Sequence, residues 1–431
     1  MDRRRFLKLA AGAGAAGVFG RHAAALGAAV SKHPPNVVLI ISDDQHWSSF
    51  GFMGSDVVKT PHLDKLAGGG VVLRRSYVPT ALCRPSLATL STGLYPHQHR
   101  ITGNDASRGI ANGREESIKL FCGVPALPRM LAGCGYNCLQ TGKWWEGSWK
   151  RGGFTHGMTR GSRHGDVGLK IGRETMQPFH DFIDESVKAD KPFFVWYAPF
   201  LPHLPHNPPR RLLDKYITPG RPKALATYYA MCEWFDETCG DVLGCLDKKG
   251  LADNTLVIFV VDNGWTQGAR RHGAFGDKRG KRTVYEGGIR TPIVVRWPGR
   301  VRPGVDETHL ASSIDIVPTI LAACGLEPTA DMQGVNLLDA AALGKRERIF
   351  GEGFAHDMAD LAHPARSCDA RWCIEGRWKL IIRADKDGGK DGKVELYDVL
   401  TDADEKKNQA ASQPDKVKAL RARINQWWPA K

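Results

Sequence analysis

Two acidic clusters in the sequence could supply ligands to a metal ion. Asp43 and Asp44 form the first cluster, and Asp262 and Asn263 form the second. Each follows a short apolar segment rich in β-branched residues, which predicts a strand buried on both faces of a parallel sheet. Because ligands gather outside the carboxyl ends of such strands, the two clusters can meet in space. Carboxylate and amide oxygens suit calcium or magnesium, whereas Asp-Asn-Gly is also an ordinary turn.

A cysteine that could act as a nucleophile lies between the two clusters. Cys83 is followed by Arg84, Pro85 and Ser86. Pro-Ser can open a helix, because proline is tolerated in the first helical turn. Such a helix would place Cys83 at its positive N-terminal end. A nucleophile there would face the position at which an anion binds.

Three basic side chains complete a set that could hydrolyse the ester of a tetrahedral oxyanion. They are Lys143, His203 and Lys281. A divalent cation, a nucleophile and Lys or His donors suit this reaction, because charge builds on the nonbridging and leaving oxygens. Simpler interpretations stand beside this one. Lys143 could be a solvated or helix-capping lysine, and His203 a loop histidine with His206 as its rival. Lys281 could be one charge of a solvated basic run.

Alternating strands and helices are predicted to position these residues. Buried strands are expected at 37–41, 193–197 and 256–261, and helices near 116–133, 222–249 and 315–324. This alternation is typical of the α/β class, with a large, mostly parallel sheet between helices.

The pattern of predicted elements changes after about residue 340. Strands are predicted at 377–382 and 394–398, with a glycine-rich turn at 386–393 between them and a helix at 414–428. We therefore expect an export signal at 1–30, a catalytic domain at 31–340 and a small α+β subdomain at 341–431.

Composition indicates a globular protein with an anionic partner. The chain has 431 residues, 42% of them hydrophobic, and a formal net charge of +14. This is enough apolar material for a sizeable core and excludes a disordered chain. The basic charge favours an anionic substrate, lipid or nucleic acid. No nucleic-acid recognition motif accompanies it, so we expect no nucleic-acid partner.

The N-terminus predicts export from a bacterial cytoplasm. Three arginines at 3–5 precede an uncharged stretch at 9–20 and small residues at 23–29. This is the pattern of an export signal, because a bilayer span needs roughly 20 apolar residues. The paired arginines resemble the twin-arginine type, which implies that export machinery as a partner and a periplasmic or extracellular location. Residues 1–30 carry five basic residues and one acidic residue, so their removal lowers the net charge from +14 to +10. The alternative is a basic N-terminal arm.

Nine short motifs, in order, resemble the type I sulfatases of the alkaline phosphatase superfamily, a family that includes arylsulfatases, N-sulfoglucosamine sulfohydrolase and choline sulfatase. They are Asp43-Asp44, residues 60–66, the Cys83 motif, and residues 142–144, 202–203, 262–264, 285–288, 315–319 and 396–398. One such fragment would carry little weight, whereas nine in the family's order indicate its fold and ancestry.

The resemblance implies roles for the candidate residues. The family's cysteine is oxidised to formylglycine by a formylglycine-generating or sulfatase-maturing enzyme, which makes Cys83 the precursor of the nucleophile. Asp43, Asp44, Asp262 and Asn263 match the family's calcium ligands. Lys143, His203 and Lys281 match groups that bind the sulfate oxygens or protonate the leaving oxygen. A covalent nucleophile splits one difficult displacement into two easier ones.

Two positions depart from the family's pattern. Leu87 replaces the usual arginine of the cysteine motif, and Trp145 replaces a common histidine. One hypothesis is that Arg84 supplies the missing cation, and that His99 or His206 replaces the imidazole.

One further histidine, His356, either contacts substrate or is a surface polar residue.

These observations predict an exported sulfatase that cleaves a sulfate ester or sulfamate, on a sulfated carbohydrate. Two alternative functions remain open. A phosphodiesterase or phosphonate hydrolase could use the same fold, because a metal ion and a nucleophile also serve phosphoryl transfer. A catalytically silent relative could bind sulfated glycans, with Leu87 and Trp145 marking lost chemistry.

Overall fold

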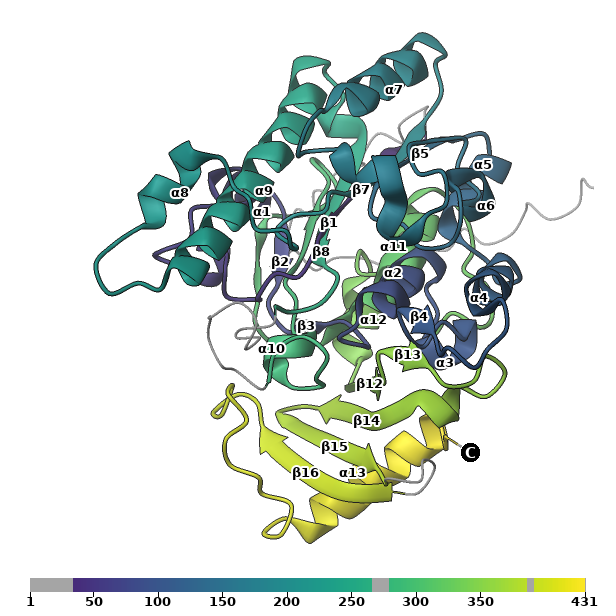
Figure 1. Cartoon of the computed structure of the whole chain (residues 1–431), viewed down its shortest axis with the longest axis vertical. Helices are drawn as coiled ribbons and strands as arrows, with labels where there is room; N and C mark the ends of the chain where they lie inside the picture. Colours follow the sequence, from purple (N-terminus) through teal and green to yellow (C-terminus); the bar gives the residue numbers. More distant parts are fainter. Residues whose placement is uncertain (1–33, 266–278, 386–390, 431) are drawn as a thin grey trace, which may run out of the picture. The chain divides into compact units, whose positions relative to one another are not determined.

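A central sheet contains all three of the strands predicted for the catalytic domain. The computed structural model describes residues 34–265, 279–385 and 391–430. The eight strands of the sheet lie in the order β10 (Gly304–Asp306), β2 (Val71–Leu73), β9 (Ile293–Arg296), β8 (Thr255–Val261), β1 (Asn36–Ser42), β7 (Phe193–Ala198), β5 (Asn137–Gly142) and β6 (His156–Gly157). Only β9 runs antiparallel to its neighbours in this sheet. The predicted α/β class with a mostly parallel sheet is therefore confirmed (Figure 1).

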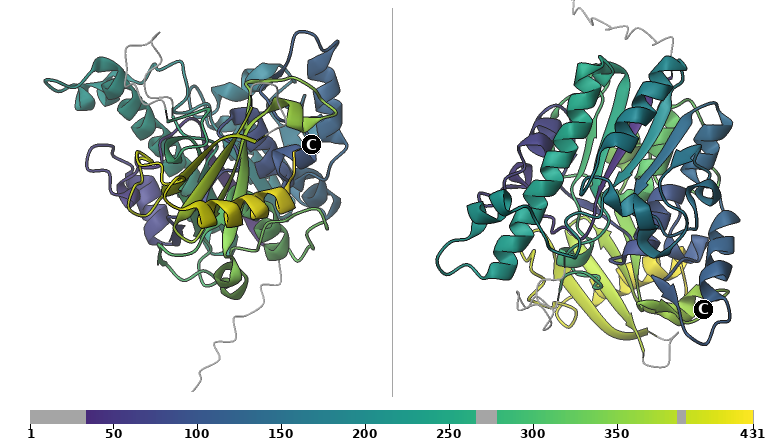
Figure 2. Two further views of the ribbon diagram at one scale, coloured as in Figure 1. Left: turned by 90° about the horizontal axis from the view of Figure 1, so that it is seen from below. Right: turned by 45° about the horizontal axis from the view of Figure 1, so that its top comes forward.

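Helices cover both faces of this sheet, because successive residues of the central strands point to opposite faces and are apolar on both. In β1, Val37 and Leu39 pack into one core, whereas Val38 and Ile40 pack into the other. The first core includes side chains of α2 (Cys83–Thr92), α4 (Gly113–Cys122), α5 (Leu127–Gly133), α11 (Ile316–Ala323) and α12 (Ala340–Lys345). The second includes side chains of α1 (Pro61–Gly68), α7 (Gln177–Lys188) and α9 (Lys223–Lys248), as the right view of Figure 2 shows.

Shorter elements connect these layers. The remaining helices outside the C-terminal region are α3 (Pro96–His99), α6 (Trp149–Gly152), α8 (Arg210–Tyr216) and α10 (Glu286–Ile289). Two small two-stranded pairs join β3 (Ser76–Tyr77) to β11 (Ala311–Ser312) and β4 (Asp105–Ala106) to β13 (Asp357–Met358).

One predicted helix is divided in the structure. The segment 116–133 forms the end of α4 and all of α5. Gly123 caps α4, and Pro128 lies in the first turn of α5, where proline is tolerated. The predictions at 222–249 and 315–324 correspond to α9 and α11, each to within one residue at either end.

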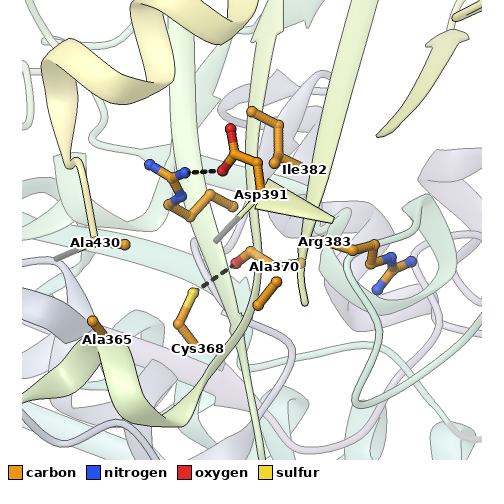
Figure 3. A pocket seen from close by; sticks show the side chains of 9 residues that line it. Ala365, Cys368, Ala370, Ile382, Arg383, Asp391 and Ala430 are labelled. Carbon is orange, nitrogen blue, oxygen red and sulfur yellow. Dashed lines mark hydrogen bonds and ion pairs between the residues drawn. The ribbon is translucent and has the colours of Figure 1, made fainter. Parts of the chain in front are cut away.

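The C-terminal region forms a second, antiparallel sheet. Its strands lie in the order β12 (Arg348–Phe354), β14 (Cys368–Glu375), β15 (Trp378–Ala384) and β16 (Asp391–Asp398), and α13 (Pro414–Trp427) packs against them. Strands β12 and β14 were not predicted, and β16 begins inside the predicted glycine-rich turn. Arg371 joins this sheet to the chain end, because it donates to Asp391 and to the Trp428 carbonyl beside the small cavity in Figure 3.

Two predictions are not tested by the structure. The export signal at 1–30 lies outside the described residues. The domain boundary at residue 340 stays a prediction. Over the residues whose structure is described, none of the helices has the length and apolarity that a membrane span requires.

Candidate active site

The two acidic clusters lie side by side at the carboxyl edge of the central sheet. Strands β1 and β8 are parallel neighbours, with Ser42 opposite Val261, so the residues that follow them emerge together. The Asp44 amide donates to Asp262 Oδ1 at 3.0 Å, and Asn263 Nδ2 donates to Asp44 Oδ1 at 2.7 Å. The structure thus brings together residues that lie more than two hundred positions apart in the sequence.

Buried oxygen atoms in this cluster fit a divalent cation. Asp43 Oδ2, Asp262 Oδ2 and Asn263 Oδ1 are buried without a hydrogen-bond donor. Burial, together with the charges of Asp43 and Asp44, raises the pKa of Asp262 well above its usual range. Leaving such groups without a partner is costly, and carboxylate and amide oxygens are the ligands that a hard cation prefers. The donor set therefore fits calcium or magnesium.

Cys83 faces this cluster from the start of α2. It is the first residue of the helix and is 2% exposed. Its Sγ lies 3.7 Å from Asp44 Oδ1 and 3.0 Å from Lys281 Nζ. Burial raises the pKa of the thiol to about 12, so the side chain is a neutral thiol at physiological pH.

Lys143 reaches the same cluster from the end of β5. Its Nζ lies 2.6 Å from Asp43 Oδ1 and 3.6 Å from Asp262 Oδ2. The turn before it requires glycine, because Gly142 has a φ of +71° and a Cβ there would lie 1.8 Å from the Ala198 carbonyl oxygen. The chain can therefore turn sharply enough to bury Lys143 beside the carboxylates.

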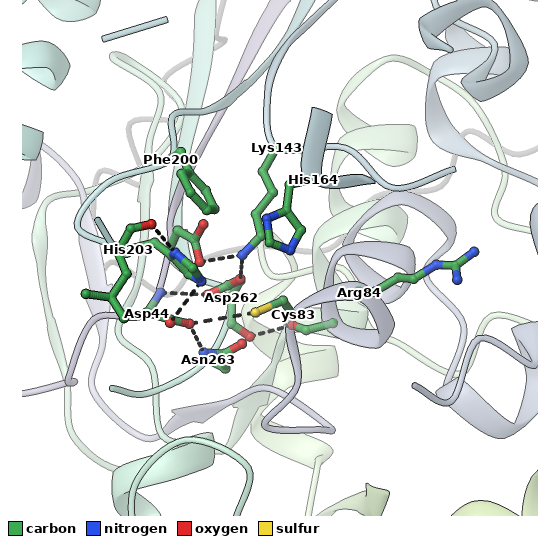
Figure 4. Close-up of polar contacts among 12 residues, drawn as sticks. Asp44, Cys83, Arg84, Lys143, His164, Phe200, His203, Asp262 and Asn263 are labelled. Atoms are coloured by element: carbon green, nitrogen blue, oxygen red, sulfur yellow. Dashed lines mark hydrogen bonds and ion pairs between the residues drawn. The ribbon is translucent and has the colours of Figure 1, made fainter. Parts of the chain in front are cut away.

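His203 and Lys281 approach Asp44 from two loops, and Figure 4 shows His203 beside Asp44. His203 Nε2 lies 3.5 Å from Asp44 Oδ2, and its Nδ1 donates to the Leu204 carbonyl at 2.7 Å. Arg173 holds this loop by donating to the carbonyl oxygens of Phe200 and His203. Lys281 Nζ donates to both carboxylate oxygens of Asp44, at 2.5 and 2.6 Å.

Arg84 does not face Cys83, contrary to the expectation that it supplies a cation there. Its guanidinium forms two bonds of 2.7 Å with Glu146 and a third, of 2.9 Å, with Ser117 Oγ. Its side chain is fully buried in this pair. The cation beside Cys83 is Lys281 instead.

The other three predicted histidines also lie outside the cluster around Cys83. His99 is buried against Thr89 and the Ile101 amide, and burial lowers its pKa to about 3. The ring of His206 lies 6.1 Å from that of Tyr228 and 6.5 Å from that of Trp265. His356 contacts Asp357 and Asn104. The structure gives none of the three a contact with Cys83 or the acidic cluster.

The two departures from the family's pattern have different structural consequences. Leu87 is 4% exposed and packs in the core beneath α2. Trp145 is buried, and its ring centroid lies 4.4 Å from that of His164. His164 was not predicted as a site residue, and no motif marks it. The ring centroid of His164 lies 6.0 Å from that of His203.

Two family models and several known proteins match the sequence. Residues 35–326 match the family described as Sulfatase, and residues 271–427 match N-sulphoglucosamine sulphohydrolase, C-terminal. The chain is 31% identical to arylsulfatase A of Homo sapiens over 368 residues, which cover 73% of this chain and 69% of that protein. It is 29% identical to N-acetylgalactosamine-6-sulfatase of Sus scrofa over 375 residues, covering 75% and 69%.

The fold alone is shared more widely. The crystal structure of the phosphonate monoester hydrolase of Agrobacterium radiobacter superposes with a TM-score of 0.67 at 21% identity, covering 90% of this chain and 96% of that one. Similarity at that level shows the fold and leaves the reaction open, so the assignment depends on the sequence matches. By those matches the chain belongs to the sulfatase family, whose members hydrolyse sulfuric ester bonds.

Proposed function

We propose that the protein cleaves a sulfate ester or sulfamate on a sulfated carbohydrate, with a calcium ion and a formylglycine derived from Cys83. One feature of the structure supports this proposal most strongly. Cys83, two lysines, a histidine and the oxygen ligands for a cation converge within one buried cluster. Each kind of group has a role in displacement at a tetrahedral oxyanion.

The cation would be held by Asp43, Asp44, Asp262 and Asn263. The buried oxygens of Asp43, Asp262 and Asn263 that lack a hydrogen-bond donor support this assignment. A bound calcium ion would supply positive charge to the sulfate oxygens and neutralise the crowded carboxylates.

The lysines and His203 would act on the substrate itself. Lys143 and Lys281 carry fixed donors into a buried site, where each charge interaction is stronger than in water. They would bind the nonbridging sulfate oxygens. His203 holds its Nδ1 proton against the Leu204 carbonyl, which leaves Nε2 as the atom that exchanges a proton with the leaving oxygen.

Formylglycine at residue 83 would supply a hydrated aldehyde as the nucleophile. The position supports this assignment, because residue 83 begins α2 and lies between Lys281 and Asp44. A formylglycine-generating or sulfatase-maturing enzyme would be the required partner.

The substrate class follows from charge and from the relatives. The basic net charge favours a polyanion, and one relative is an N-acetylgalactosamine-6-sulfatase. The N-terminal pattern at 1–30 supports export by the twin-arginine machinery to the periplasm or beyond. Cell fractionation, with the paired arginines changed to lysine as the control, tests that location.

Paired substrates test the reaction. Steady-state rates with an aryl sulfate, an aryl phosphate and an aryl phosphonate should give the highest kcat/KM for the sulfate. The phosphonate monoester hydrolase of similar fold makes the reverse order the main alternative. A faster rate with the phosphate or phosphonate would overturn the proposal, and no turnover of any of them would favour a silent glycan-binding protein.

A further inference from the structure

His164 lies beside the proposed sulfate-binding groups, although it is distant from them in the sequence. Its ring centroid lies 5.4 Å from that of Phe200 and 6.0 Å from that of His203. The Nζ of Lys143 lies 5.4 Å from the centroid of the same Phe200 ring. Figure 4 shows the His164 ring next to the Lys143 side chain. These four side chains therefore form one wall of the site.

An unusual backbone conformation places His164 there. His164 and Asp166 have φ values of 69° and 40°, in the left-handed region that non-glycine residues avoid. The turn is held by the Asp166 carboxylate, which accepts hydrogen bonds from the amides of Arg160, Gly161 and Ser162. The His164 carbonyl also accepts from the Trp144 amide at 3.0 Å. Such strain persists only where surrounding contacts enforce it, and it is concentrated at functional sites.

Arg163 determines which nitrogen of His164 carries the proton. Its Nη1 lies 2.6 Å from His164 Nε2. A guanidinium has only donors, so Nε2 must accept and the proton must be on Nδ1. Arg163 is itself fixed by two bonds to Asp105, of 3.1 and 2.8 Å, and lies 4.8 Å from the centre of the Trp145 ring. The ring of His164 is thus a neutral donor with a defined tautomer.

We propose that His164 is a substrate-binding residue, whose Nδ1–H donates a hydrogen bond to an oxygen of the sulfate group held by Lys143 and Lys281. This inference rests on the proposed function. It assigns to residue 164 the imidazole that the sequence lacks at Trp145, and it makes Arg163 and Trp145 the residues that position it.

Two substitutions separate the hydrogen bond from the backbone conformation. Asparagine and glycine both tolerate the left-handed region, but only asparagine keeps a side-chain donor. His164→Gly should weaken the binding of inorganic sulfate by about 10- to 100-fold, the range for a hydrogen bond to a charged group. His164→Asn should lose less. His180→Ala is the control, because His180 is a half-buried histidine of α7 that pairs with Asp241.

Calorimetric titration with sulfate, on protein loaded with calcium, measures these affinities, and kcat/KM for an aryl sulfate should fall in parallel. Nitrogen NMR of labelled histidine should show the His164 signal with Nδ1 protonated. Sulfate affinity unchanged in His164→Gly would overturn the inference, as would equal losses in both variants. If the wild type fails to turn over sulfate esters, the proposed function fails, and the sulfate affinities still decide the role of His164.

Discussion

Replacing Arg84 with methionine should lower the free energy of unfolding but leave the folded protein catalytically active. The Arg84 side chain is fully buried and forms two bonds of 2.7 Å with Glu146, whose side chain is 4% exposed. Arg84→Met leaves that carboxylate buried and unpaired. Breaking a buried ion pair in this way costs about 3–5 kcal/mol, which corresponds to a change in the unfolding equilibrium of roughly 150- to 4,000-fold.

Urea unfolding measures this loss, and turnover per folded molecule measures the chemistry. The double variant Arg84→Met/Glu146→Leu is the matched control, because replacing both partners with apolar side chains is often neutral or stabilising. We expect it to recover the lost stability. A stable Arg84→Met protein without activity would contradict a purely structural role, since it would show that the guanidinium takes part in catalysis.

Four further predictions concern the cation, the catalytic loops and the C-terminal region. Chelation with EDTA should abolish sulfate ester turnover and lower the thermal midpoint, since a cation bound only by the folded state stabilises that state; added calcium should restore both, and unchanged activity would exclude a metal role. Gly142→Ala should lower the free energy of unfolding by at least about 1–3 kcal/mol and misplace Lys143, because a Cβ would lie 1.8 Å from the Ala198 carbonyl oxygen. A variant with wild-type stability and kcat would contradict this expectation. Arg173→Met should lower kcat/KM by about tenfold or more, because it frees the loop that carries His203. Arg221→Met, which removes a similar bond to the Tyr216 carbonyl, should not, and equal effects would argue against a positioning role. Burial raises the pKa of Glu405 to about 7, so its carboxyl binds its proton more tightly in the folded state. The free energy of unfolding should therefore fall as the pH rises from about 4.5 to 7. Glu405→Gln should flatten that part of the calorimetric stability profile, and an unchanged slope would exclude Glu405 as its cause.

The sequence predicted those parts of the site that strand ends define. Asp43, Asp44, Asp262 and Asn263 follow buried strands, and parallel neighbours place such residues at one edge. Cys83 was predicted to begin a helix because Pro85 is tolerated in a first turn, and α2 begins there. These inferences needed only local patterns and one rule of sheet topology.

The directions of individual side chains could not be predicted from the sequence in the same way. Arg84 adjoins Cys83 in sequence, but successive helical residues point in different directions, and its partner Glu146 lies sixty-two positions away. His164 lies on a turn without helical or strand periodicity, so no pattern linked it to His203. In the C-terminal sheet, β12 contains Gly351 and Gly353, which weaken a strand pattern, and tertiary packing decided its conformation.

Mass spectrometry of the peptide that contains Cys83, from protein made in its native host, shows whether residue 83 is converted to formylglycine. We expect an aldehyde in place of the thiol at residue 83, in a preparation that cleaves aryl sulfates. An unmodified cysteine in a fully active preparation would contradict it.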